Sequence, residues 1–200
     1  MKYTFALLSL LALLSCKNTT DKTSEEISEE TQEEITTYTL TKEVNNEFED
    51  LEDGGMLLLG KINKSGLTTA PYNEWFTESE TNHNLDSTTI DSLKPLLNDV
   101  KISVFMGTWC EDSQREIPAL YKILDVTDFN YENFSIVAVS HDKKTPNGLE
   151  KGHRIEYVPT IIFTKNGDTL NRIVEYAHGT LEQDMLTILK GKPYNPAYSE

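Results

Sequence analysis

The sequence has very little cysteine, with only Cys16 and Cys110 among its 200 residues. This count excludes a scaffold held by several disulfides, and it excludes a metal centre built from several cysteines. The chain also has no Gly-rich phosphate-binding loop and no Gly-x-Ser-x-Gly turn. Nucleotide-dependent chemistry and serine hydrolysis are therefore not expected.

Positive charge is also scarce. The chain has 18 Lys and Arg against 33 Asp and Glu, which gives a net charge of −15 at pH 7. Such a chain repels phosphates, so we expect no nucleic-acid partner. The apolar run at residues 5–14 is too short to span a membrane as a mature helix, so we expect no integral membrane protein.

The N-terminus has the pattern of a bacterial lipoprotein signal peptide. Lys2 precedes the apolar run, and the sequence Leu-Leu-Ser-Cys that ends at Cys16 resembles a lipobox. We predict that residues 1–15 are removed, that Cys16 is lipidated, and that the membrane partner is in the cell envelope. The residue after the lipidated cysteine is Lys17 and not the acidic residue that would retain a lipoprotein in the inner membrane. The sequence therefore favours the outer membrane. An ordinary secretory signal cleaved nearby is the alternative.

Acidic residues dominate the segment at residues 16–37, where Glu-Glu pairs recur among Ser and Thr. The segment has too few apolar side chains for their burial to offset the conformational entropy that ordering would cost. We therefore predict that residues 16–37 form a disordered tether. An acidic binding tail is the less favoured alternative. Beyond it, we predict an N-terminal extension at residues 38–99, packed on a domain at residues 100–200.

A strand that leads directly into a helix carries the second cysteine. Residues 101–106 contain apolar strand formers without a breaker, and Gly107 then interrupts them. From Cys110 to Asp125 apolar residues recur at helical spacing. Free N–H groups and the positive end of the dipole at a helix N-terminus stabilise a thiolate, so we predict a reactive thiol at Cys110.

Three motifs resemble the thioredoxin family. Trp109 and Cys110 stand at a helix start with a proline eight residues after the cysteine, Val158-Pro159-Thr160 opens a later strand, and a Lys-Asn-Gly-Asp turn follows. The resemblance implies an α/β fold, a three-layer sandwich in which helices flank a central mixed sheet. It also implies that Pro159 is a cis-proline facing the cysteine, and that Trp109, Val158, Pro159 and Thr160 bind substrate.

Two positions depart from the family pattern. Ser113 stands where the family has its second redox cysteine, and Val104 stands where it has a buried acid. Cys110 can still form a mixed disulfide with a substrate. Ser113, one helical turn along the same face, can donate a hydrogen bond to the thiolate but cannot resolve that disulfide. We therefore predict that Cys110 and Ser113 are the catalytic residues of a monothiol site.

The rest of the domain follows in short elements. A buried strand is predicted at residues 134–140. The last strand is predicted at residues 170–176, and Thr180 with Gln183 forms a capping box that opens the last helix. Between the strands, a turn at residues 145–148 precedes a predicted short helix. This order matches the α/β sandwich.

Two histidines lie between these strands. His141 follows the first strand at the edge of the sheet where such folds hold their sites. We interpret His141 as a solvent-exposed loop residue, with contact to the active site or metal binding beside Cys110 as the alternatives. His153 ends the predicted short helix, six residues before Pro159.

We therefore expect thiol–disulfide exchange with protein or small-molecule thiols and disulfides, through one thiol and without cofactor or metal. The alternative is a redox-inactive binding module that holds a peptide or envelope protein in the groove beside Trp109 and Pro159.

A copper chaperone that uses Cys110 and a histidine is the least favoured. Peroxidase activity is not expected, because only Thr108 matches the Pro and Thr that peroxiredoxins need upstream of the cysteine.

Overall fold

A computed structural model describes residues 38–199 of the chain. The predicted signal peptide, Cys16 and the predicted tether lie outside the described residues. Within residues 38–199, no helix has the length and apolar character that crossing a membrane requires.

The core of the protein is one mixed sheet of six strands in the order β1-β2-β4-β3-β5-β6. The strands are β1 Asn46–Glu49, β2 Met56–Ile62, β3 Val100–Met106, β4 Phe134–Ala138, β5 Thr160–Lys165 and β6 Asp168–Val174. β3 and β4 run parallel, and every other neighbouring pair runs antiparallel. The predicted α/β class with a mixed sheet is confirmed, as are the strands expected in β3, β4 and β6.

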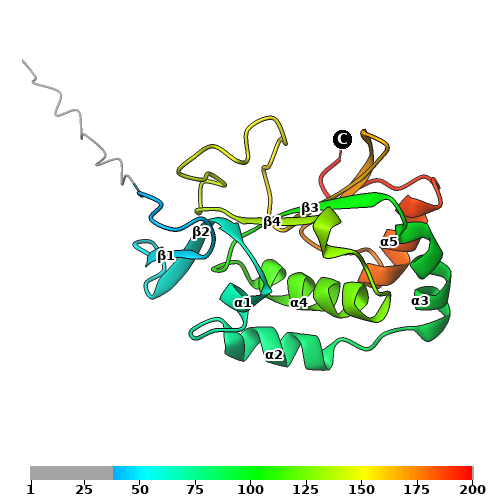
Figure 1. The fold of residues 1–200 in the computed structure, drawn as a ribbon, viewed down its shortest axis with the longest axis horizontal. Coiled ribbons are helices and arrows are strands. Elements are labelled where there is room, and N and C mark those ends of the chain that lie inside the picture. The colour runs from blue at the N-terminus through cyan, green and yellow to red at the C-terminus, as the bar shows by residue number, and fades with distance from the viewer. Residues whose placement is uncertain (1–37, 200) are drawn as a thin grey trace, which may run out of the picture. The chain divides into compact units, whose positions relative to one another are not determined.

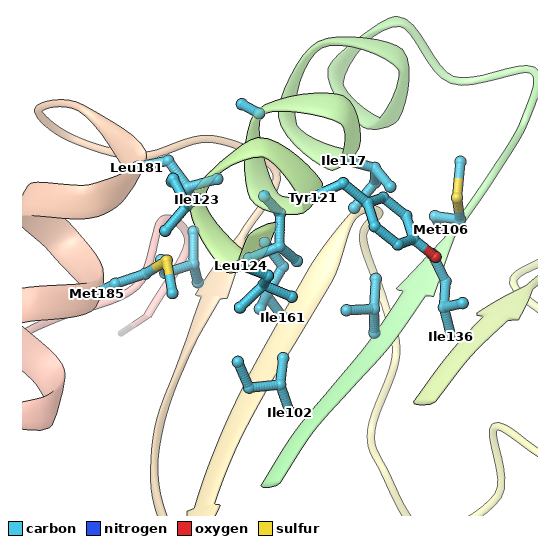
Figure 2. Close-up of a cluster of buried hydrophobic side chains, with 14 of the residues drawn as sticks. Ile102, Met106, Ile117, Tyr121, Ile123, Leu124, Ile136, Ile161, Leu181 and Met185 are labelled. Atoms are coloured by element: carbon cyan, nitrogen blue, oxygen red, sulfur yellow. The ribbon is translucent and has the colours of Figure 1, made fainter. Parts of the chain in front are cut away.

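Helices cover one face of this sheet. They are α1 Lys64–Leu67, α2 Asn73–Asn82, α3 Ser87–Leu93, α4 Glu111–Val126 and α5 Leu181–Leu189, with short 3-10 turns η1 Lys94–Leu97 and η2 Tyr131–Asn133. The apolar side of α4 is buried, as its periodicity predicts. In Figure 2, Leu124 of α4 lies over Ile161 of the sheet, and Tyr121 of α4 lies beside Met106 and Ile136, all within one buried cluster that also includes Met185 of α5.

The N-terminal part of the described chain belongs to the same sheet. β1 and β2 form a hairpin, and β2 then pairs with β4 from Gly60 to Ile62. α2 packs on α4, where the Phe76 ring centre lies 5.8 Å from that of Tyr121. Residues of the predicted extension thus supply two strands of the sheet, β1 and β2, and a helix, α2, that packs on α4.

The second face of the sheet is covered by a loop, which corrects the expected three-layer sandwich. In Figure 1, α2, α4 and α5 lie on one side of the sheet, and the chain between β4 and β5 passes over the other side. The short helix predicted to end near His153 is wrong, because residues 143–154 form turns. Gly148 and Gly152 have φ values of 70° and 84°, and Pro146 lacks a backbone donor, so this sequence does not support a helix.

Candidate functional site

Cys110 is the residue that caps the N-terminus of α4. Its backbone is extended, with φ −88° and ψ 122°, and its carbonyl oxygen accepts a hydrogen bond from the Gln114 N–H at 2.9 Å. The side chain is half-buried and is a free thiol. The thiol donates to the carbonyl oxygen of Val158, with Sγ and O 3.1 Å apart. This position combines partial access to solvent with the positive end of a helix.

The segment Val158-Pro159-Thr160 meets the thiol through the Val158 carbonyl oxygen. The Val158–Pro159 peptide bond is cis, and Val158 and Thr160 are 2% and 1% exposed. Thr160 Oγ1 donates to the carbonyl oxygen of Tyr157 at 2.7 Å, and the carbonyl oxygen of Pro159 accepts from the Glu175 N–H at 2.8 Å. The fold therefore joins the thiol to a segment 48 residues away whose backbone is firmly held.

Trp109 is held on several sides. Its indole Nε1–H donates to the carbonyl oxygen of Val139 at 3.0 Å, and its ring stacks on the imidazole of His141 with centres 4.2 Å apart and planes 19° apart. Gly107 lies against the ring, since a Cβ built at Gly107 would be 2.5 Å from Trp109 Cε2. Lys143 Nζ lies 5.5 Å from the ring centre. The residue before the thiol thus has a fixed side chain.

Ser113 lies in the first turn of α4 and is completely buried. Its Oγ accepts a hydrogen bond from the Gly107 N–H at 3.2 Å, so it ties the helix to the turn that follows β3. The hydrogen bond that we expected between Ser113 and Cys110 is replaced by the contact of the thiol with Val158. In this structure Ser113 shapes the loop beneath the thiol.

Acidic residues follow the thiol on α4. Glu111 is exposed, and Asp112 forms an ion pair with Arg115 at 2.6 Å. Further along, Glu116 is 8% exposed and its Oε1 lies 3.0 Å from Arg115 Nε. Burial raises the pKa of Glu116 even though Arg115 opposes the shift.

His141 is where the structure corrects the sequence interpretation. The side chain is 15% exposed, so it is not a solvent-exposed loop residue. Besides stacking on Trp109, its Nε2–H lies 3.1 and 3.0 Å from the two carboxylate oxygens of Asp50. Asp50 belongs to the turn between β1 and β2 and is 3% exposed. Burial raises the pKa of Asp50, but the hydrogen bonds from His141 and two backbone N–H groups outweigh it and the pKa is lowered.

Sequence reasoning missed Asp50, because its surroundings, Asp-Leu-Glu-Asp-Gly-Gly, have only the character of a turn. Asp50, Asp53 and His141 place one possible ligand atom each within 4.8 Å of one another. The hydrogen bonds of Asp50 already account for this cluster. Cys110 is not part of it, and so the arrangement gives no support to a copper site that joins the thiol to His141.

A separate cavity of about 700 Å³ is lined by residues of β2, β3 and β4. Its lining combines apolar residues such as Phe105 and Val137 with the polar side chains of Lys61 and Ser103. His153 also lines it and packs on Phe105, with ring centres 4.8 Å apart. Trp109, Cys110 and Pro159 do not line this cavity, although Phe105 belongs to the apolar cluster against which Trp109 and Cys110 pack.

Comparisons with known proteins give only distant likenesses. No family model matches the chain, and no curated protein matches it. Among solved structures, a Pseudomonas aeruginosa protein of unknown function is 18% identical, with 60% of this chain and 81% of that chain covered and a TM-score of 0.44. An HIV epitope-scaffold protein is also 18% identical, with 60% and 83% covered and a TM-score of 0.43. Mitochondrial thioredoxin 3 of Saccharomyces cerevisiae, in its oxidised form, is 22% identical over 48% of this chain and 86% of that chain, with a TM-score of 0.29.

Proposed function

We propose that the protein is a thioredoxin-like, lipid-anchored protein of the cell envelope that takes part in thiol–disulfide exchange through Cys110. The observation that carries the proposal is the position of the half-buried thiol, at the N-terminus of α4 and 3.1 Å from the Val158 carbonyl oxygen. The segment Val158-Pro159-Thr160 beside it is one of the motifs that suggested the resemblance. The anchor rests on the lipobox that ends at Cys16.

The proposed reaction has two exchange steps. The Cys110 thiolate attacks one sulfur of a substrate disulfide, the substrate S–S bond breaks, and a new S–S bond joins Cys110 to half of the substrate. The other half leaves as a thiolate and takes a proton from solvent. An external thiol then attacks the mixed disulfide, takes over the bound half as a new disulfide, and returns Cys110 to the thiolate. This cycle suits isomerisation or removal of thiol adducts better than net reduction.

Direct mass measurement tests this proposal. The mature protein, treated with bis(2-hydroxyethyl) disulfide, is expected to gain one mercaptoethanol adduct, and Cys110→Ser is expected to gain none. Ser113→Cys is the informative partner variant, because residues three apart in the first turn of a helix can form a disulfide. It should form an internal disulfide and gain dithiol reductase activity. An unreactive wild-type thiol under these conditions would refute the proposal.

A binding module is the second candidate function, but the observation that favours it is the 700 Å³ cavity beside Phe105 and His153 and not the groove beside Trp109 and Pro159. A cavity of this size falls within the range of small-molecule and peptide sites. Under this alternative, Cys110→Ser captures the same envelope partner with unchanged affinity, and substitution of Lys61 in the cavity weakens capture. Under exchange chemistry, Cys110→Ser loses its covalent partners and Lys61→Ala keeps them.

A further inference from the structure

The hairpin turn between β1 and β2 reaches the residues beside the thiol. Asp50 starts the turn, where its N–H donates to the Gly55 carbonyl oxygen at 3.0 Å and its own carbonyl oxygen accepts from the Gly54 N–H at 2.9 Å. Its carboxylate accepts from the backbone N–H groups of Glu52 and Asp53 at 3.1 and 3.3 Å. The orientation of this buried carboxylate is therefore fixed by its own turn.

His141 transmits that orientation to the tryptophan. Its Nε2–H bonds the Asp50 carboxylate, which sets the plane of the imidazole, and the indole of Trp109 lies nearly parallel to that plane. The Trp109 Nε1–H bond to Val139 fixes the rotation of the indole in its own plane. Three residues from separate parts of the chain thus form one array, Asp50–His141–Trp109, and Cys110 is the next residue.

We propose that Asp50 and His141 are positioning residues that act through Trp109 to hold the Cys110 site in its reactive geometry. This inference rests on the proposed exchange function. An indole held beside the thiol offers an apolar wall for the incoming disulfide, and a wall that is already ordered does not lose conformational entropy when substrate binds. Small displacements of such positioning groups slow enzyme reactions strongly.

Hydrogen-bond capacity argues against a direct chemical role for Asp50. A carboxylate has about four lone-pair sites, and those of Asp50 face His141 and two backbone N–H groups. The carboxylate makes no hydrogen bond to Cys110, whose thiol bonds the Val158 carbonyl oxygen. Asp50 is therefore assigned to the geometry of the site and not to proton transfer.

The test compares two reactions of the same thiol in the mature full-length chain. Exchange with bis(2-hydroxyethyl) disulfide uses the wall, whereas alkylation by the small reagent iodoacetamide does not. We expect His141→Leu to slow exchange about tenfold and alkylation by less than about twofold. His141→Phe, which keeps a ring against Trp109, should restore most of the exchange rate. The double variant Asp50→Asn/His141→Leu should be no slower than His141→Leu, because the two residues act in one array.

Two controls separate positioning from a general loss of stability. Thr89→Ala removes a hydroxyl that bonds Asp86 in α3 at 2.6 Å, so it weakens the fold elsewhere and should leave both rates unchanged. In a Trp75→Phe background, where Trp109 is the remaining tryptophan, His141→Leu should shift the emission of Trp109 and Thr89→Ala should not.

The outcomes are distinct. Exchange by His141→Leu at the wild-type rate, or equal slowing in Thr89→Ala, overturns the positioning inference and leaves the exchange function standing. Equal slowing of exchange and alkylation in His141→Leu also overturns it, because the effect would then lie on the thiol itself. Wild-type protein that is alkylated but does not exchange refutes the proposed function, and this inference with it.

Discussion

Gly107→Ala is the substitution for which the structure gives the clearest magnitude. Gly107 does not have a positive φ, so alanine fits the backbone there, and any cost must come from the new methyl group. That group would lie 2.5, 2.7 and 2.8 Å from Cε2, Nε1 and Cζ2 of Trp109. The indole is rigid, so the whole ring must move.

The expected cost combines overpacking with the contacts that the ring loses. Inserting a methyl group into a packed site costs about 1–3 kcal/mol. Movement of the ring breaks the 3.0 Å bond from Nε1 to Val139, which contributes about 1 kcal/mol, and the stack on His141, for which aromatic pairs give about 0.5–1.5 kcal/mol. These contributions overlap, so we expect Gly107→Ala to lower the free energy of unfolding by roughly 2–4 kcal/mol.

Urea unfolding followed by circular dichroism measures this loss, and Gly179→Ala is the matched control. A Cβ at Gly179 would meet Gln183 Oε1 at 2.8 Å, which is the end of a flexible side chain, so this variant should lose less than about 1 kcal/mol. In a Trp109→Leu background the clash is absent, and the added cost of Gly107→Ala should fall below about 1 kcal/mol. A Gly107→Ala protein within about 0.5 kcal/mol of wild type would show that Trp109 is not held as described.

Three further predictions concern other parts of the chain. Phe76→Ala empties a fully buried site between α2 and α4 and should lower the free energy of unfolding by about 3–5 kcal/mol, whereas the exposed neighbour Thr77→Ala should change it by less than about 0.5 kcal/mol. Burial raises the pKa of Glu116 in the folded state, so its ionised form opposes folding above pH 4.5 and not below it. Glu116→Gln should therefore have a higher melting temperature than wild type at pH 7, and the two should converge at pH 4 or below. Cys16→Ala should release the protein from membrane fractions or block its processing, and correctly processed Cys16→Ala protein that stays in the membrane would contradict the anchor.

Local periodicity predicted much of the domain. The helical spacing of apolar residues from Cys110 to Asp125 matches α4 almost residue for residue, because one buried face fixes that spacing. The strand that ends before Gly107 and the one that begins at Phe134 also follow from their apolar runs. The resemblance to thioredoxin placed Val158 and Pro159 opposite Cys110, and in the structure the Cys110 thiol bonds the Val158 carbonyl oxygen.

Contacts between distant segments could not be read from the sequence. The register that pairs Gly60 with Ala138 depends on the fold as a whole, and local spacing does not contain it. The same is true of His141, whose neighbours in sequence are polar but whose side chain is covered by Asp50, 91 residues away. The wrong helix before His153 had a different cause, because turn glycines at residues 148 and 152 outweighed a weak helical pattern.

The array beside the thiol bears on how the sequence departs from the thioredoxin pattern that it resembles. That pattern has a buried acid where this chain has Val104, which is 1% exposed and lies in the apolar core under α4. A buried carboxylate is nevertheless present beside His141, which stacks on Trp109, and it belongs to Asp50 of the hairpin turn between β1 and β2. Its oxygens bond His141 and two backbone N–H groups, so it does not take the place of a proton acceptor for a second thiol. Under the proposed exchange function, Cys110 would have no resolving thiol to deprotonate and would depend on substrate placement and an external thiol. A hairpin that orders Trp109 would serve that need.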